Sequence, residues 1–471
     1  MADPTQWVFW TPNLFVSIGG KTSWLAAVAA AKADEPLVVA GVLLSLVVIY
    51  LASKIGGEIC VRLNLPPVLG DLVGGVVVGV SILKLLVFYA PGDAEISSTM
   101  INLLQSTAGL EPAAARPTFA AISEVISILS ELGVIVLLFE IGLESELNEL
   151  IKYGPPAMIV AVVGVIMPFT AGTLGLQNLF HVPVIPAIFA GAALTATSIG
   201  ITAKVLAEIG QLGAKEGQII IGAAVLDDIL GIIVLAVVAN LVKTGNVEVT
   251  NIAYLIVSAG VFLVGGIFLG RFLSPYYVAL VKNLKTRGSV LISALTIAFI
   301  LSYIGAAIQL EAILGAFAAG LILGETELQQ ELKAQVVPVA DMFVPIFFVV
   351  VGAKTNLGVL NPAVPSNREG LMMAMFLITV AILGKVVAGF TVLTPGINRL
   401  AIGIGMIPRG EVGLVFAAVG STTGALSESL EAAIIMMVIL TTFLAPPLLR
   451  VVFQARSGEP LRSPVVESAK E

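Results

Sequence analysis

The chain has 471 residues, of which 58% are hydrophobic and 12% charged, with a formal net charge of −7. Soluble domains carry about 45–50% apolar and about 25% charged residues, so this composition excludes an ordinary soluble protein. The acidic balance offers no basic stripe for nucleic acid. The single cysteine, Cys60, excludes an internal disulfide and a cysteine-based metal cluster. No enzyme constellation is present, so we expect neither catalysis nor a cofactor.

Apolar runs long enough to cross a bilayer recur along the chain, as in Ile219–Leu241 and Leu371–Leu393. A helix needs about 20 such residues to span the hydrocarbon. The pattern predicts an all-α polytopic membrane protein with about thirteen transmembrane helices. The expected spans lie near 37–53, 67–88, 126–146, 156–179, 183–208, 217–242, 251–273, 289–306, 311–324, 338–356, 370–393, 399–421 and 430–452. The long loop 89–120 is expected to carry a helix of its own.

Two segments of the chain resemble each other at constant spacing. Leu138–Leu147 aligns with Phe348–Leu357 at an offset of 210, which places Gly142 on Gly352. An earlier stretch, Val68–Gly75, aligns with Ile313–Gly320 at an offset of 245. Matched spans are seven helices apart, and since seven is odd they run in opposite directions. We therefore predict two inverted six-helix repeats, a device of transporters that place their substrate site where discontinuous helices meet.

The repeats define the expected organisation of the chain. The predicted parts are an N-terminal interfacial segment with three tryptophans (1–36), the first repeat (37–242), a linker helix and loop (243–288), the second repeat (289–453) and a tail (454–471). Lys and Arg concentrate in one set of alternate loops, as at Lys215, Lys285 and Arg399. By the positive-inside rule this predicts an N-terminus outside and a C-terminus in the cytoplasm.

Two of the expected spans are interrupted by residues that disfavour a continuous membrane helix. Thr195–Gly200 (TATSIG) places hydroxyls and glycine inside the fifth span, and its repeat partner Gly405–Glu411 (GMIPRGE) places proline, glycine and two charges inside the twelfth. Such segments must be buried or line a cavity. Freed carbonyls, together with Thr197 and Ser198, would suit a hard cation. A simple kink is the alternative, and two repeat-related breaks argue against it.

Charged residues lie deep within three predicted spans: Asp227 and Asp228 in the middle of the sixth, Lys385 in the middle of the eleventh, and Arg409 at the break in the twelfth. Each costs about 2.5–3.5 kcal/mol at a helix centre when unpaired, so they are expected to be paired or to face water. Adjacent helix positions differ by about 100°, so one aspartate can face a countercharge and the other a cavity. A purely structural Asp–Lys pair explains one aspartate but hardly both.

Three further acids are weaker candidates. Glu411 stands two residues from Arg409, and mutual neutralisation with a purely structural purpose is the alternative to a functional role for this pair. Glu140 and Glu144 are four residues apart on one face at the end of the third span. That face is either an ordinary solvated helix end or the mouth of a cavity with a role in pH response.

These motifs together resemble the monovalent cation:proton antiporters, in particular the bacterial sodium/proton antiporters of the cation:proton antiporter-2 family. The segments are also similar to those of cyanobacterial members. The resemblance covers about 37–453 and rests on five motifs. They are Leu138–Glu144 (LFEIGLE), Thr195–Gly200 (TATSIG), Asp227-Asp228 within AAVLDDILG, Lys385 within LGK, and Arg409–Leu414 (RGEVGL). It implies a homodimer with a scaffold part, and a core of spans four to six and eleven to thirteen that moves like an elevator.

The resemblance also implies roles for single residues. Asp228 matches the carboxylate that binds the cation, and Asp227 matches the neighbour that pairs with a membrane lysine, here Lys385. Relatives with two acids and this lysine tend to be electrogenic. The expected substrates are Na⁺ and H⁺, and the expected location is a bacterial cell membrane, or a thylakoid membrane if the chain is cyanobacterial.

The expected mechanism is competition between ions for one site. Sodium between the aspartates would displace the proton of Asp228 and draw Asp227 away from Lys385, which would then release its own proton. K⁺/H⁺ exchange at the same site remains open, since selectivity depends on dimensions that the sequence does not show. A sodium-coupled symporter of an organic solute would need a larger polar pocket, and a cation channel would need a filter motif.

Overall fold

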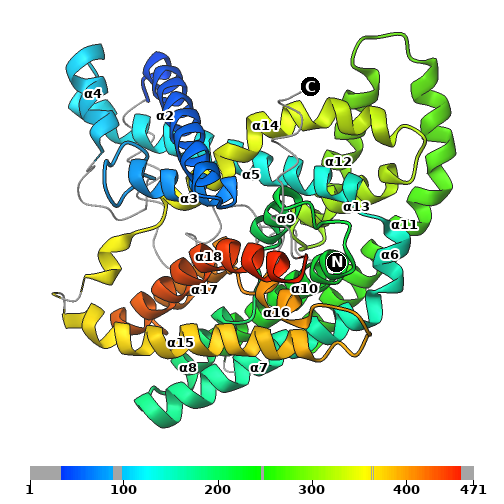
Figure 1. Cartoon of the computed structure of the whole chain (residues 1–471). Helices are drawn as coiled ribbons and strands as arrows, with labels where there is room; N and C mark the ends of the chain where they lie inside the picture. The colour runs from blue at the N-terminus through cyan, green and yellow to red at the C-terminus, as the bar shows by residue number, and fades with distance from the viewer. Residues whose placement is uncertain (1–32, 89–97, 245–248, 362, 364, 458–471) are drawn as a thin grey trace, which may run out of the picture. The chain divides into compact units, whose positions relative to one another are not determined.

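A computed structural model describes residues 33–88, 98–244, 249–361, 363 and 365–457. The regular elements of this part of the chain are all helical (Figure 1). The longer helices are α2 (Glu35–Arg62), α5 (Pro112–Glu144), α7 (Gly154–Phe180), α10 (Lys215–Thr244), α11 (Val249–Asn283), α12 (Ser289–Ala307), α14 (Gln329–Ala353), α15 (Pro365–Phe390) and α18 (Glu428–Ser457). The shorter ones are α3 (Pro67–Val78), α4 (Thr99–Ala108), α6 (Leu147–Lys152), α8 (Val184–Ala193), α9 (Ile199–Glu208), α13 (Ala312–Gly324), α16 (Arg399–Gly405), α17 (Gly410–Thr422) and the 3₁₀ turn η3 (Leu357–Leu360).

Nine helices of the described residues are long and apolar enough to cross a membrane. The other four predicted spans correspond to α3, α13 and two interrupted pairs, α8–α9 and α16–α17. The prediction of about thirteen spans in an all-α protein is therefore confirmed, and α4 is the helix expected within 89–120. The N-terminal tryptophans and most of the predicted tail lie outside the described residues.

The second predicted span, 67–88, is shorter than predicted. Helix α3 ends at Val78, and the N–H groups of Leu85 and Leu86 both donate to the Val78 carbonyl, at 3.0 and 2.9 Å. The apolar run therefore continues as a chain reversal, with Lys84 in the left-handed backbone region at φ 52°. Hydropathy alone does not register such a turn, because the residues after Val78 remain mostly apolar.

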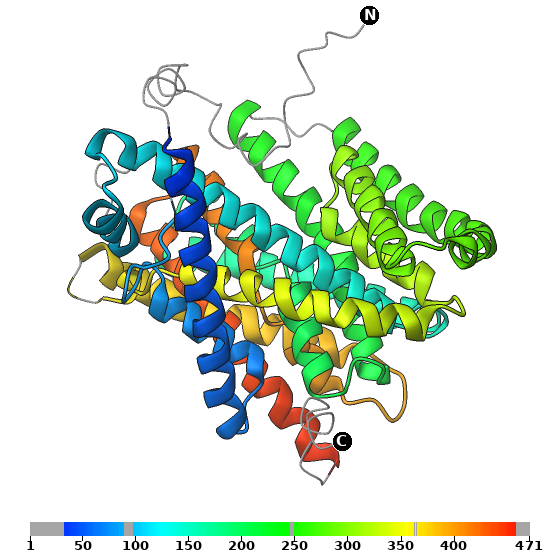
Figure 2. The same ribbon diagram turned by 90° about the horizontal axis from the view of Figure 1, so that it is seen from above.

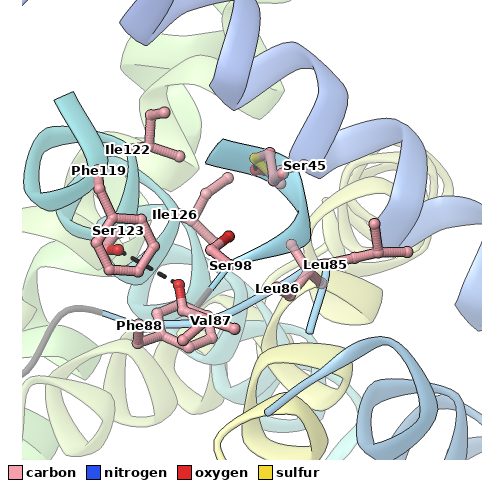
Figure 3. A pocket seen from close by; sticks show the side chains of 11 residues that line it. Ser45, Leu85, Leu86, Val87, Phe88, Ser98, Phe119, Ile122, Ser123 and Ile126 are labelled. Atoms are coloured by element: carbon pink, nitrogen blue, oxygen red, sulfur yellow. Dashed lines mark hydrogen bonds between the residues drawn. The ribbon is translucent and has the colours of Figure 1, made fainter. Parts of the chain in front are cut away.

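The chain divides into two compact units. The first contains α2 up to Gly56, α3 from Gly70, α4, the part of α5 before Val134, and the end of α14 from Met342. Buried Ile, Leu, Val and Phe side chains of these helices form its core. The core contains a cavity of about 10 Å³, lined mostly by apolar side chains and by three serine hydroxyls, including that of Ser98 (Figure 3). This volume holds about one water molecule, so the cavity excludes an organic solute.

The second unit contains the remaining helices. In it α15 packs against α18, α7 and α16, while α7 also contacts α8 and α10 (Figure 1). Helices α11, α12 and α13 form a second group, drawn in green to yellow-green in Figure 2. Within this group α13 contacts both α11 and α12. Alanine, leucine, isoleucine and methionine side chains of α7, α8, α15, α17 and α18 supply the core of the first group. The long helices α10 and α18 pack against the halves of both interrupted helices.

Close glycine crossings support the inverted repeat. A Cβ atom on Gly142 would lie 2.9 Å from the Cα of Gly320, and one on Gly320 would lie 2.8 Å from the Cα of Gly142. The pair Gly75 and Gly352 repeats this arrangement, with corresponding distances of 2.9 and 3.0 Å. Since Gly352 is the repeat partner of Gly142 and Gly320 that of Gly75, each crossing is the image of the other. Small residues of this kind let membrane helices approach at backbone distance.

Replacing Gly142 with Ala is expected to destabilise the protein by about 1–3 kcal/mol, because the added methyl group must push two backbones apart. Thermal unfolding in detergent measures the effect. The matched control is Gly266→Ala on α11, where nothing lies within 4 Å of the new Cβ. That variant should be neutral or stabilising by up to about 1 kcal/mol. Equal stability of the two variants would contradict the tight crossing.

Candidate functional site

Both interrupted helices open at the positions that the sequence predicts. Helix α8 ends at Ala193 and α9 begins at Ile199, while α16 ends at Gly405 and α17 begins at Gly410. The two breaks meet, because the N–H of Ser198 donates to the carbonyl of Pro408 at 2.8 Å. These two residues are separated by 210 positions, the repeat offset. The reverse bond cannot form, since proline has no N–H.

In the unwound segments, backbone carbonyl groups accept hydrogen bonds from side chains instead of from helical N–H groups. Lys385 Nζ donates to the Thr195 carbonyl at 2.9 Å, and Arg409 Nη1 donates to the Ala196 carbonyl at 2.6 Å. In the second repeat the equivalent carbonyls are those of Gly405 and Met406. Their donors are the hydroxyls of Thr202 and Thr197, at 2.8 and 3.0 Å. Carbonyls without such partners would be costly to bury in a membrane.

The two breaks therefore differ in charge although their backbones correspond. Cations cap the end of α8, where the helix dipole is negative, and neutral hydroxyls cap the end of α16. A hydroxyl keeps acceptor lone pairs after donating its proton, whereas an ammonium or a guanidinium has none. A cation at the breaks would therefore find available oxygen ligands on the side of Thr197 and Met406 rather than on the side of Lys385 and Arg409.

Asp227 and Lys385 form a fully buried ion pair. Lys385 Nζ lies 3.0 Å from Asp227 Oδ2, and neither side chain has exposed surface. Asp227 Oδ1 is buried and has no hydrogen-bond partner among the described residues. The lysine side chain runs past Gly164 of α7, where a Cβ atom would lie 3.2 Å from Nζ. A glycine at this position leaves room for the ammonium.

Asp228 lies on the next face of α10 and is 6% exposed. Helix α10 packs against all four half-helices, α8, α9, α16 and α17, so both aspartates are carried into the region of the breaks. Asp228 interacts electrostatically with Lys385 but forms no salt bridge with it, in contrast to Asp227. The adjacent acids thus have different surroundings, as the 100° helical step requires.

Arg409 is also fully buried. Beyond its bond to Ala196, its Nε and Nη2 atoms have no hydrogen-bond partner in the described part of the chain. Glu411 lies in the first turn of α17. Its side chain is outside the described set, so its predicted pairing with Arg409 stays a prediction.

With both acids and both bases ionised, the formal charges of Asp227, Asp228, Lys385 and Arg409 cancel.

Glu140 and Glu144 lie near the end of α5. Glu144 forms a salt bridge of 2.6 Å with Lys333 of α14. The charged groups that act on Glu140 are Glu144, Lys333, Lys204 of α9 and Asp341 of α14. Both glutamates therefore belong to a partly buried network of mixed charge rather than to a bare solvated helix face.

Sequence reasoning missed Thr202 and two buried glutamates. Glu208 accepts from the N–H of Val68, and Glu216 accepts from the N–H of Asn398 at 2.7 Å. The repeat alignment offered a signal for Thr202, because it places Gly405 opposite Thr195 and so marks a second unwound carbonyl that needs a donor. No comparable signal pointed to the glutamates.

Replacing Thr202 with Val is expected to cost about 1–3 kcal/mol of stability, since the Gly405 carbonyl would lose its donor in a buried site. Thermal unfolding in detergent measures this. Thr379→Val on α15 is the matched control, because its hydroxyl bonds the Met375 carbonyl of its own helix on an exposed face. The control should change stability by less than about 0.5 kcal/mol. Similar losses in both variants would contradict the special role of Thr202.

The sodium/hydrogen exchanger family model (transmembrane) matches residues 42–455, nearly the whole chain. The chain belongs to this family. It is 67% identical over 425 residues to the high-affinity Na⁺/H⁺ antiporter NhaS3 of Synechocystis sp., covering 90% of this chain and 92% of that protein. It is 32% identical over 418 residues to the Na⁺/H⁺-K⁺ antiporter GerN of Bacillus cereus, covering 87% and 95% of the two chains.

The fold of this sodium/hydrogen exchanger family member is also found among solved structures. The sodium proton antiporter MjNhaP1 from Methanocaldococcus jannaschii superimposes with a TM-score of 0.57, covering 89% of this chain and 97% of that one. At 16% identity this likeness concerns the fold alone. Family membership and the apolar helices establish an integral multi-pass membrane protein.

Proposed function

We propose that this protein exchanges Na⁺ for H⁺ across a membrane at Asp228, with Asp227 and Lys385 as the coupled pair. The observation that carries the proposal is the buried Asp227–Lys385 ion pair beside two crossed helix breaks. The 67% identity of the chain to a protein named as a Na⁺/H⁺ antiporter supports Na⁺ and H⁺ as the substrates.

The exchange proceeds by competition. Na⁺ binds Asp228 and the oxygens near Thr197 and Ser198, and it displaces the proton of Asp228. It also draws Asp227 away from Lys385, which is then a buried ammonium without its counter-ion and gives up a proton. Two protons leave for one sodium ion, so exchange is electrogenic. A core that holds α7 to α10 and α15 to α18 carries the ion between the two faces by an elevator-like motion.

Glu140 and Glu144 have an accessory role in this proposal. Together with Lys204 and Lys333 they form a network of acidic and basic groups that links the end of α5 to the half-helix α9. We assign it to the cavity mouth and to the response of transport to pH. Arg409 and Glu411 complete the charge balance of the site.

The direct test uses purified protein in sealed vesicles with an internal pH dye. Addition of Na⁺ should move protons in the opposite direction, faster when a K⁺ diffusion potential favours net charge movement. Vesicles without protein are the control. Exchange rates that do not depend on the membrane potential would contradict electrogenic exchange. Absence of Na⁺-triggered proton movement under any pH gradient would reject antiport and favour solute symport.

A K⁺/H⁺ activity at the same site is the second candidate. It is favoured by the 32% identity to GerN, whose name includes K⁺. The same vesicles with K⁺ in place of Na⁺ measure the ratio of the two activities. A K⁺ response equal to or above the Na⁺ response would reverse the assignment of the substrate.

We also propose a homodimer in a lipid bilayer, with the N-terminus outside and the C-terminus in the cytoplasm, in a cell or thylakoid membrane. The apolar surfaces of α2 and α11, whose spanning windows are 22% and 17% buried, offer faces for lipid or a second copy. Mass measurement of the purified protein in detergent tests the dimer, and labelling of either terminus in intact cells tests the orientation.

A further inference from the structure

The half-helix α9 makes a polar contact at the end opposite the ion site. It begins after Ser198, at the break, and ends at Glu208. The Glu208 side chain is buried, with Glu208 7% exposed, and both of its carboxylate oxygens lie 3.2 Å from the backbone nitrogen of Val68. A buried carboxylate in this position is unrelated to the binding of Na⁺ or H⁺ at Asp228, so it requires another explanation.

The start of α3 explains why the carboxylate is held there. Pro66 and Pro67 have no N–H group, so Val68 supplies the first backbone donor of this helix. The first N–H groups of a helix lack intrahelical partners, and the positive end of its dipole attracts a carboxylate. Glu208 supplies that carboxylate from another helix, and the contact joins α9 to α3.

The contact crosses the boundary between the moving and the fixed parts of the proposed mechanism. Helix α9 is half of the interrupted fifth span, which belongs to the moving core. Helix α3 is the second span, which belongs to the scaffold. If the core moves, the bond between Glu208 and Val68 must break in every transport cycle.

The second repeat lacks an equivalent contact. At the repeat offsets Glu208 falls on Ala418 of α17, which is exposed, and Val68 falls on Ile313 of α13. Helix α13 is also preceded by a carboxylate of its own, Glu311 at the N-cap position. In a transporter with inverted repeats, the arrangement of one half in one end state corresponds to the arrangement of the other half in the opposite end state. A carboxylate contributed only by the first half therefore stabilises one end state over the other.

We propose that Glu208 is a positioning residue that holds the half-helix α9 against the start of α3 in one end state and so sets the resting equilibrium of the transporter. This proposal rests on the alternating-access exchange proposed above. We call this contact the latch: it favours the end state in which the site is open to one membrane face, and its loss shifts the equilibrium toward the state open to the other face. A charge-assisted hydrogen bond of this kind corresponds to a bias of about tenfold to a hundredfold between the states.

The test measures the Na⁺ KM at each membrane face, in right-side-out and everted vesicles, for the wild type and for Glu208→Ala. Apparent affinity at a face scales with the population of the state open to it. Loss of the latch should lower the KM about tenfold or more at one face, the face closed in the latched state, while the KM at the other face rises by no more than a few-fold. Glu208→Gln, which keeps one acceptor oxygen, should produce a smaller shift in the same direction.

The matched control is Glu216→Ala. Glu216 is also a buried glutamate, 9% exposed, and it caps the start of α16 through the N–H of Asn398, but α10 and α16 both belong to the moving core. Its loss should lower stability without a difference between the faces. Changes below about threefold at both faces in both Glu208 variants, or equal changes at the two faces, would overturn the latch. Absence of Na⁺-driven proton movement in the wild type would instead overturn the proposed function itself.

Discussion

Replacing Asp228 with Asn should reduce Na⁺-driven proton movement at least about a hundredfold while the protein remains folded. Asparagine has nearly the same shape, but its neutral amide can neither carry the exchanged proton nor offer an anionic oxygen to the cation. Asp228 is 6% exposed and forms no salt bridge with Lys385, so its loss leaves the buried Asp227–Lys385 pair intact. Vesicles with an internal pH dye measure the rate, and thermal unfolding in detergent verifies the fold.

Glu58→Gln is the control for this variant. Glu58 is an exposed acid on α2 that pairs with Arg62 one helical turn away, and surface pairs of this kind contribute about 0–1 kcal/mol. This substitution removes one negative charge without touching the helix breaks, so exchange should remain at the wild-type rate. Sodium-driven exchange that survives in Asp228→Asn would remove Asp228 from the site.

Replacing Lys385 with Met should destabilise the protein by about 3–5 kcal/mol, because it leaves Asp227 as a buried carboxylate without its partner. The charge balance among these four groups gives the same direction, since the two acids Asp227 and Asp228 would then be balanced by one base, Arg409. Thermal unfolding in detergent measures the loss. A decrease below about 1 kcal/mol would indicate that water or another group already compensates Asp227.

The double variant Asp227→Asn with Lys385→Met separates the pair from its surroundings. Removing both partners of a buried ion pair is often neutral or stabilising, whereas removing one is not. The remaining charges of Asp228 and Arg409 also balance. The double variant should therefore regain most of the stability that Lys385→Met loses. A double variant no more stable than the single one would contradict the direct coupling of Asp227 to Lys385.

Much of the architecture was predictable because the bilayer limits the options. Apolar runs of about 20 residues must be helices in lipid, so thirteen spans followed from hydropathy alone. The inverted repeat was predicted from the spacing of glycines along the chain. The crossings of Gly142 with Gly320 and of Gly75 with Gly352 show why glycine is needed at these positions. Only glycine permits backbones to approach so closely. The end of α3 at Val78 was mispredicted, since a chain reversal built from apolar residues leaves no trace in hydropathy.

The candidate site was predictable in its residues but not in its contacts. Charges in a predicted span are conspicuous, so Asp227, Asp228, Lys385 and Arg409 could be selected from the sequence alone. Adjacent aspartates must face different ways, yet only packing decides that Lys385 meets Asp227. In the same way, the sequence does not show that Arg409 donates to the Ala196 carbonyl.

The sequence by itself determined the membrane class, the spans, the two breaks and the charges within them, because each follows from local composition or from spacing along the chain. The tertiary structure alone decided which carbonyls the cations and hydroxyls cap, and where Glu208 binds. Those contacts join residues far apart in the sequence, such as Thr202 with Gly405 and Glu208 with Val68. Their partners are backbone N–H and carbonyl groups, which every residue except proline carries alike, so side-chain identity cannot reveal them.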